Sequence, residues 1–273
     1  MVLFGSSYPI GKIGLNNELS PLIFSLLRIA PMFIILLPFL KFSSIFKKNF
    51  KFVLCYGVLM GLGLYPSMYL SLEYTQSTSS IILIMQLSIP LGVILGSIFL
   101  SEKVSKLRWS LIGMIIVGLT FVCFDPIVFK SLVSIILGIL AAVSYGLASM
   151  ISRKISNFGS LEVNSWMAII SLPIMIFLVF IFESEELKII FKHSWDVYLP
   201  ALYSGIIVSC IAQVLMLWLY KHYDVQTVIP FYSLFPIFGI ILTILLLGEK
   251  ISYLIITGSI IVISGNFFLQ KIK

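Results

Sequence analysis

The residue that most strongly suggests chemistry in this sequence is a single arginine inside a long apolar run. Arg28 follows the start of that run at Pro21 and therefore lies about 10 Å into a helix that rises 1.5 Å per residue. A charge at this depth in lipid is costly and needs a carboxylate, carbonyl groups, water or a bound anion. We predict that Arg28 contacts a substrate carboxylate or another anion. The alternative is a structural arginine that bonds helix ends or extends to the membrane surface.

Two more polar residues occupy matching places before prolines. Gln86 stands four residues before Pro90. Tyr232 stands four residues before Pro236. A proline inside a helix removes a backbone hydrogen bond and frees a carbonyl group, so we predict helix breaks at Pro9, Pro90 and Pro236. Gln86 and Tyr232 are predicted to face a substrate from two sides, and the alternative for both is interhelical packing.

Other side chains within the apolar runs are candidates for the walls of a substrate cavity. Aromatic residues at helical spacing pack against neighbours more often than they bind a ligand, so their support is weaker. These candidates are the tyrosines Tyr8, Tyr65, Tyr69 and Tyr145 together with Gln213. Tyr65 and Tyr69 are four residues apart and share one helix face.

No acidic residue lies in the middle of an apolar run. The glutamates next to the runs stand near their ends: Glu73, Glu102, Glu162, Glu183 and Glu249. Proton-coupled pumps and exporters of cationic drugs usually carry a carboxylate within the membrane, so the pattern favours carboxylate-bearing or zwitterionic solutes. The sequence has no GxxxxGK[ST] motif, Ser/His/Asp set or metal-spaced cluster. We therefore expect neither an enzyme, nor a cofactor, nor a metal site.

The composition predicts the class of protein that holds these residues. The chain has 273 residues, of which 60% are hydrophobic and 11% are charged, whereas about a quarter of a soluble domain is charged. Its mean hydropathy is +1.13. We predict an all-α integral membrane protein embedded in the lipid bilayer. The net charge of +7 comes from short basic clusters between apolar runs, so nucleic acid is not expected as a partner.

Ten apolar runs are predicted to form ten transmembrane helices. They cover residues 2–15, 21–40, 52–71, 77–100, 108–124, 131–151, 162–182, 197–220, 226–247 and 252–270. The first run is short for a spanning helix, which needs about 20 residues, and this favours a chain that starts inside its first helix.

The basic residues between the runs predict the orientation. If the N-terminus is cytoplasmic, the inside loops carry twelve of them: Lys41, Lys47, Lys48, Lys51, Lys103, Lys106, Arg108, Arg153, Lys154, Lys221, Lys271 and Lys273. The outside loops then carry four, namely Lys130, Lys188, Lys192 and Lys250. Because cytoplasmic loops are enriched in Lys and Arg, both termini are predicted to lie on the cytoplasmic side. The protein is predicted to reside in the inner (cytoplasmic) membrane.

The sequence contains an internal repeat. The ending FLSEK at 99–103 returns as LLGEK at 246–250, and Glu102 and Glu249 are 147 residues apart. Gly118 and Gly265 have the same offset. We predict two five-helix units, at 1–125 and 131–271. Five is an odd number, so the second unit enters the membrane from the opposite side, as in many secondary transporters.

Several of these features together resemble the EamA branch of the drug/metabolite transporter superfamily. They are Phe4–Gly5, Arg28, the stretch SLEYTQSTSS at 71–80 and the paired endings Pro…SEK and Pro…GEK. The resemblance covers essentially the whole chain. It implies ten helices in two inverted repeats and export of small metabolites such as amino acids. Phe4 stands where a tryptophan is usual, and Ser101 replaces a glycine.

The leading hypothesis is therefore a secondary transporter that moves small organic metabolites by alternating access. A small-multidrug-type exporter is the first alternative. An integral-membrane enzyme acting on lipid is another, but Glu102 with Lys103 and His222 with Asp224 do not form a catalytic set. A non-transporting partner subunit and assembly as a homodimer are left open.

Overall fold

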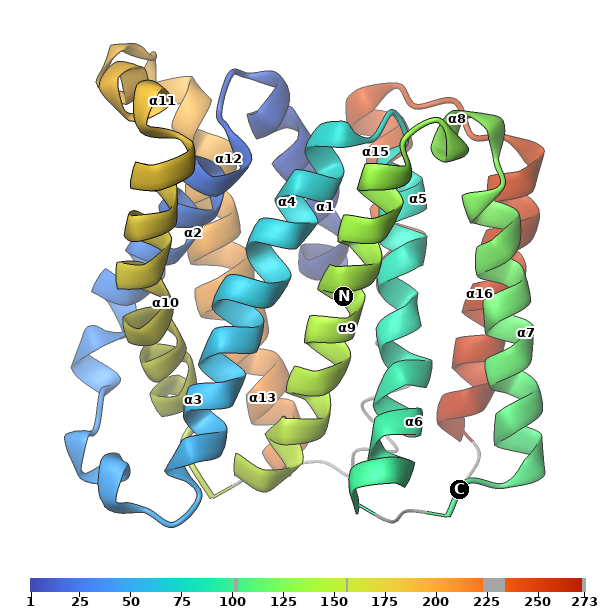
Figure 1. The fold of residues 1–273 in the computed structure, drawn as a ribbon, viewed down its shortest axis with the longest axis horizontal. Coiled ribbons are helices and arrows are strands. Elements are labelled where there is room, and N and C mark those ends of the chain that lie inside the picture. Colours follow the sequence, from blue (N-terminus) through green and yellow to red (C-terminus); the bar gives the residue numbers. More distant parts are fainter. Residues whose placement is uncertain (101–102, 156, 223–233, 272–273) are drawn as a thin grey trace.

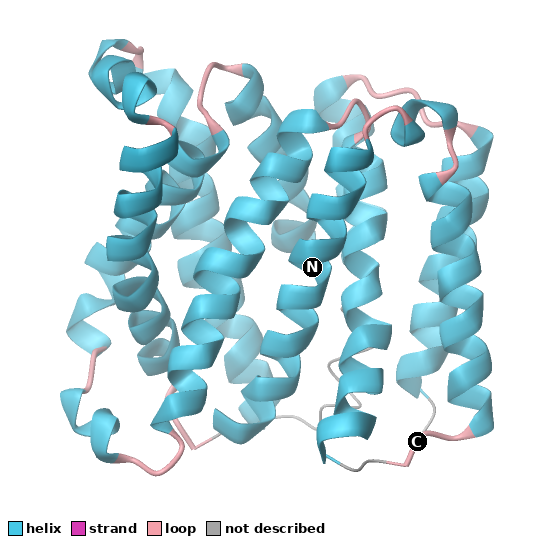
Figure 2. Cartoon of the chain, viewed as in Figure 1, coloured by secondary structure: helices cyan, strands magenta, loops and turns pink. Residues whose placement is uncertain are grey.

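The protein is a bundle of helices that run between two opposite ends. A computed structural model describes residues 1–100, 103–155, 157–222 and 234–271, and within these ranges it contains helices and no strand (Figures 1 and 2). The all-α prediction is confirmed. The first half comprises α1 (Val2–Asn16), α2 (Pro21–Leu36), α3 (Phe50–Val58), α4 (Tyr65–Tyr74), α5 (Thr78–Ile84), α6 (Ser88–Leu100) and α7 (Lys106–Cys123). The rest comprises α8 (Pro126–Phe129), α9 (Leu132–Ser152), α10 (Ser160–Phe182), α11 (Ser184–Ile189), α12 (Leu199–Tyr203), α13 (Gln213–His222), α15 (Phe235–Leu247) and α16 (Tyr253–Lys271).

Eight helical stretches in the described residues are long and apolar enough to cross a membrane. They are Pro21–Phe39, Phe50–Tyr74, Thr78–Phe99, Lys106–Cys123, Leu132–Ile155, Ser160–Phe182, Trp195–Leu219 and Tyr253–Lys271. The predicted count of ten spanning helices is not confirmed, because α1 has 15 residues and α15 has 13, fewer than the roughly 20 that a full span needs. Each of the ten predicted ranges nevertheless contains a helix.

The basic loops gather at one end of the bundle. The starts of α3 and α7 and the ends of α6, α9 and α13 lie at the lower end in Figure 1. Lys47, Lys106 and Lys154 belong to segments at those helix ends. The opposite end carries α8, which Lys130 follows, and α11, which contains Lys188. The charge asymmetry of the sequence is therefore an asymmetry between the two ends of the folded molecule.

Three spans are interrupted along their length by a segment that is not α-helical. These segments lie close to predicted site residues. A π-helical segment, η3 (Leu59–Leu64), joins α3 to α4, and a second, η8 (Ser204–Ala212), joins α12 to α13. A 3₁₀ turn, η4 (Met85–Leu87), separates α5 from α6. The hydroxyl of Ser209 donates to the carbonyl of Ser204, five residues earlier, within η8. π-helical segments often mark functional sites because they displace the residues that follow them.

Acidic residues at the ends of spans cap other helices. Glu249 accepts a 2.7 Å hydrogen bond from the Ser77 hydroxyl and a 2.9 Å bond from the Thr78 amide, at the start of α5. Glu183 accepts from the Leu22 and Ile23 amides at the start of α2. These carboxylates satisfy amides that have no partner within their own helix and lie at the positive end of the helix dipole. They also join segments more than 150 residues apart in the sequence.

We expect Glu249→Ala to lower the free energy of unfolding by about 1–2 kcal/mol, because the start of α5 loses a charged cap. Thermal unfolding of the purified protein in detergent measures the change. Lys250→Ala is the matched control, since Lys250 is the next residue and is exposed. Equal unfolding temperatures for the two variants would contradict a capping role.

Candidate functional site

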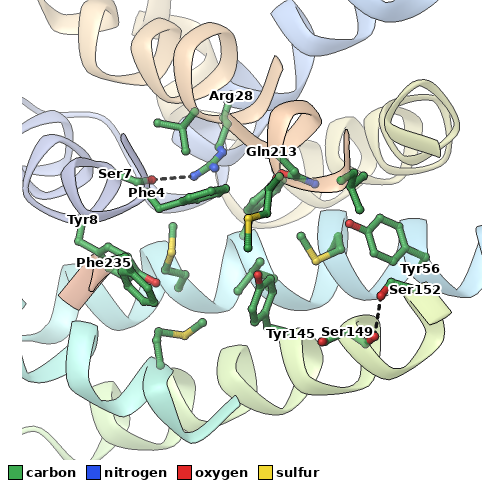
Figure 3. Close-up of a pocket in the computed structure, with 18 residues that line it drawn as sticks. Phe4, Ser7, Tyr8, Arg28, Tyr56, Tyr145, Ser149, Ser152, Gln213 and Phe235 are labelled. Atoms are coloured by element: carbon green, nitrogen blue, oxygen red, sulfur yellow. Dashed lines mark hydrogen bonds between the residues drawn. The ribbon is translucent and has the colours of Figure 1, made fainter. Parts of the chain in front are cut away.

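A cavity of about 100 Å³ is lined by α1, α2, η4, α9, α15 and the two spans that contain π-helical segments, Phe50–Tyr74 and Trp195–Leu219. Its walls combine one cation with tyrosines and methionines (Figure 3). Tyrosine side chains come from Tyr8, Tyr56, Tyr65 and Tyr145, and methionine side chains from Met60, Met68, Met85 and Met216. No aspartate or glutamate of the described chain lines it.

Arg28 supplies the positive charge, and its side chain is held in one orientation. The residue is only 4% exposed. Its Nε donates to the hydroxyl of Ser209 at 2.9 Å, and Nη1 donates to the hydroxyls of Ser7 at 3.1 Å and Tyr69 at 2.7 Å. The guanidinium also lies 4.1 Å from the centre of the Tyr65 ring. Hydroxyls and an aromatic face orient the cation without neutralising it.

The charge of Arg28 has no counter-ion in the part of the chain that the structure describes. The ion pairs found there are Lys47–Glu162, Lys188–Glu185 and His193–Glu18. Nη2 likewise makes no hydrogen bond to a described residue, whereas Nε and Nη1 do. Leaving a buried charge without an ionic partner is costly, and an anion in the cavity would offset that cost.

The backbone of Arg28 is fixed by close packing against η8. Gly205 of η8 lies so near that a Cβ on it would stand 2.5 Å from the carbonyl oxygen of Arg28. A second close crossing joins α1 to α15, where a Cβ on Gly5 would stand 2.6 Å from the Gly239 nitrogen. Small residues let helix backbones approach in this way. The crossing at Gly205 sets the distance between Arg28 and Ser209.

The residues that directly follow the two π-helical segments meet at the cavity. Tyr65 begins α4 after η3, and Gln213 begins α13 after η8. The Tyr65 hydroxyl donates to Oε1 of Gln213 at 2.9 Å. Nε2 of Gln213 donates to the side-chain oxygen of Asn164 on α10 at 2.9 Å. The Tyr65–Gln213 bond therefore joins the spans Phe50–Tyr74 and Trp195–Leu219, in each case directly after the π-helical segment.

The two ends of the cavity differ. At one end the rings of Tyr8 and Phe235 stack, with centroids 6.1 Å apart (Figure 3). At the other end lie Ser149 and Ser152, near the end of α9, and Ser149 is exposed. The cavity thus extends from Arg28 toward the end of the bundle at which α9 ends and α7 begins.

The structure brings together most of the residues predicted from the sequence. Arg28, Tyr8, Tyr65, Tyr145 and Gln213 line the cavity. Tyr69 does not line it but binds Arg28. Tyr232 lies outside the described residues.

Gln86 does not line this cavity. Its side chain is fully buried, and its Oε1 accepts a 3.1 Å hydrogen bond from Asn266 on α16. It belongs to the 3₁₀ turn η4, whose tighter winding changes the direction of side chains relative to an α-helix. Gln86 therefore packs helices together, the alternative considered for it.

The three prolines predicted to break helices lie at different places in their helices. Pro9 lies inside α1, which continues through it as a helix. Pro236 lies in the first turn of α15, where the missing amide costs no internal hydrogen bond. Pro90 lies in the first turn of α6, directly after η4. The irregular backbone around Pro90 is therefore in the residues before it.

Several residues that line the cavity or bind Arg28 were not among the site residues predicted from the sequence. Ser209 and the cavity methionines carry no signal that separates them from other small or apolar residues of the spans. Ser7 could have been found from its place beside Tyr8, since the two residues are adjacent in α1. Its role depends on Arg28 of a different helix, which the sequence does not reveal.

A second cavity bears on the enzymatic alternative. It has a volume of about 470 Å³ and is lined by residues that include Lys41, Glu162, Trp218 and His222. Glu162 is already bound by Lys47 at 3.2 Å and by the Gly159 amide at 3.1 Å. His222 stacks on Trp218. No group of three or more metal-binding side chains occurs in the described ranges. This geometry gives no support to a lipid-modifying active site.

Comparison with known proteins agrees with the fold. The family model described as "EamA-like transporter family" matches residues 1–124 and 132–270. The "Uncharacterized transporter YoaV" of Bacillus subtilis is 23% identical over 97% of this chain and 92% of its own. The "Probable amino-acid metabolite efflux pump" of Salmonella typhimurium is 21% identical over 98% of this chain and 91% of its own. One solved crystal structure has the same fold, with a TM-score of 0.63 and 14% identity over 97% of this chain and 93% of that one.

Proposed function

This chain belongs to the EamA-like transporter family and is a membrane transporter, and on that premise we propose that it exports small carboxylate-bearing organic solutes, including amino-acid-like ones, across the cytoplasmic membrane. Transport is secondary and proceeds by alternating access between two inverted five-helix repeats, at residues 1–125 and 131–271. The solute crosses unchanged, so the protein acts as a carrier and not as an enzyme.

One observation carries the proposed substrate class: a buried guanidinium without a carboxylate partner in the described chain lines the cavity. The Arg28 side chain can donate a charge-assisted hydrogen bond to a carboxylate, which is about twice as strong as a neutral one. The Salmonella typhimurium relative, named a probable amino-acid metabolite efflux pump, supports solutes of this size.

Two observations support the proposed mechanism. The family model matches two segments of similar length, and each of these segments contains one π-helical segment, within the spans Phe50–Tyr74 and Trp195–Leu219. The cavity reaches the exposed Ser149 at one end and is covered by Tyr8 and Phe235 at the other. We assign this arrangement to the inward-facing state, in which the covered end faces outward.

Transport by the purified protein in liposomes tests the proposed function. The panel consists of labelled amino acids, their 2-oxo acids, sugars and cationic dyes, each with and without imposed proton and sodium gradients. Movement of carboxylate-bearing solutes above protein-free liposomes supports the proposal. Movement of dyes alone would favour the multidrug alternative, and movement of no solute would argue against a carrier.

The topology gives a separate prediction. Single cysteines placed at Lys103 and at Lys250 should react with a membrane-impermeant maleimide from opposite sides of the membrane. Both positions are exposed. The experiment needs a background in which Cys55, Cys123 and Cys210 are replaced, because Cys55 is itself exposed. We expect Lys103 to label from the cytoplasm and Lys250 from outside, and labelling from one side only would refute the inverted repeat.

A further inference from the structure

We infer that the cavity selects carboxylates that lack an amine, such as 2-oxo and 2-hydroxy acids, over the corresponding zwitterionic amino acids. The inference rests on the proposed function and narrows its substrate class. It follows from the charges around the cavity and from the contacts that Arg28 already makes.

The first step is the charge balance of the cavity. Among the described residues that line it, Arg28 is the one that carries a charge. A carboxylate bound to Arg28 leaves the site neutral. An amino acid brings an ammonium group on the carbon next to its carboxylate, so the ammonium must sit close to the guanidinium. Like charges in a desolvated site repel strongly, and no described carboxylate is placed there to offset that repulsion.

The second step concerns the groups near Arg28 that could hold an ammonium without a carboxylate. An aromatic face is the usual choice, through a cation–π contact. Among the aromatic rings around the cavity, those of Tyr65 and Tyr69 contact Arg28, whose guanidinium carbon lies 4.1 Å and 5.9 Å from their centres. Oε1 of Gln213 is an acceptor, but it already receives the Tyr65 hydroxyl at 2.9 Å. An ammonium held beside the guanidinium by the bound carboxylate would therefore compete with Arg28 and Tyr65 for these groups.

The third step concerns the anion. Ser209, Ser7 and Tyr69 occupy Nε and Nη1 of the guanidinium. Among the donors of Arg28, Nη2 is left without a described partner, which suits one carboxylate oxygen. The neutral carbonyl or hydroxyl of a 2-oxo or 2-hydroxy acid adds no charge beside it. Such acids keep the favourable contact and avoid the repulsion that an amine introduces.

The test compares three solutes with one carbon skeleton: leucine, 4-methyl-2-oxopentanoate and 2-hydroxy-4-methylpentanoate. Their kcat/KM values for transport are measured with the full chain in liposomes. We expect both acids that lack the amine to exceed leucine by at least about tenfold, the size of effect that a like-charge contact produces. In the Arg28→Gln variant, whose folding is checked by thermal unfolding, the ratio of kcat/KM for either acid to kcat/KM for leucine should approach one.

Each outcome has a distinct meaning. Leucine moving as well as or better than the other two acids would overturn the inference and leave the proposed function standing. Movement of none of the three, nor of any solute in the wider panel, would overturn both. A ratio that persists unchanged in a folded Arg28→Gln protein would also overturn the inference, because the selectivity would then come from elsewhere.

Discussion

Arg28→Gln is expected to reduce kcat/KM for carboxylate transport by roughly 10- to 100-fold, the loss of one charged hydrogen bond to the solute. Thermal stability should stay the same or rise. The folded protein buries a cation that has no ionic partner in the described chain, and removing such a charge relieves a desolvation cost. Glutamine keeps a donor and an acceptor for Ser7 and Ser209.

A matched control lies one turn earlier on α2. Ser25 is fully buried, and its hydroxyl donates to the carbonyl of Pro21 within the same helix at 2.8 Å. Ser25→Ala should leave carboxylate transport unchanged. If Arg28→Gln were strongly destabilised and Ser25→Ala were not, Arg28 would be a structural residue that bonds helices, as its alternative interpretation states.

Gly205→Ala is expected to be the most damaging small substitution near the site. The added Cβ would stand 2.5 Å from the Arg28 carbonyl oxygen, a backbone atom that cannot move without moving α2. Overpacking of this kind typically costs about 1–3 kcal/mol. Because the shift separates Arg28 from Ser209, transport should fall together with stability. Thermal unfolding and liposome transport measure the two effects.

Gly92→Ala provides the comparison, since a Cβ there meets nothing within 4 Å. Gly92 lies inside α6, where alanine is favoured over glycine by about 0.5–1 kcal/mol. The two variants should therefore change stability in opposite directions. A Gly205→Ala protein as stable and active as Gly92→Ala would show that α2 and η8 are not held at the distance described.

Sequence reasoning could predict much of this fold, because the physical constraints on membrane helices are strong. Long apolar runs must be helical in lipid, and Lys47 or Lys154 must stay at the membrane ends. The π-helical segments could not be predicted. Their register depends on contacts such as that of Gly61 with Ser171 on α10, and a single sequence does not show which distant helix supplies the contact.

Site residues could be predicted from the sequence where their own position in an apolar run identified them. They could not be predicted where their role depends on how two spans pack against each other. A charge within an apolar run marks Arg28 whatever its neighbours are. Gln86 seemed equivalent to Tyr232 by spacing from a proline, but the turn η4 directs it toward Asn266. Ser209 could not be identified from the sequence, because its contact with Arg28 depends on the packing of α2 against η8.

The methionine walls of the cavity have a consequence for selectivity. Met60, Met68, Met85 and Met216 are unbranched and polarizable, so they can repack around bodies of different shape. Arg28 is fixed by three hydroxyls and cannot adapt in the same way. The transporter should therefore be strict about the charge of its substrate and tolerant of its shape. Linear, branched and aromatic acids of one charge are expected to compete for the same site.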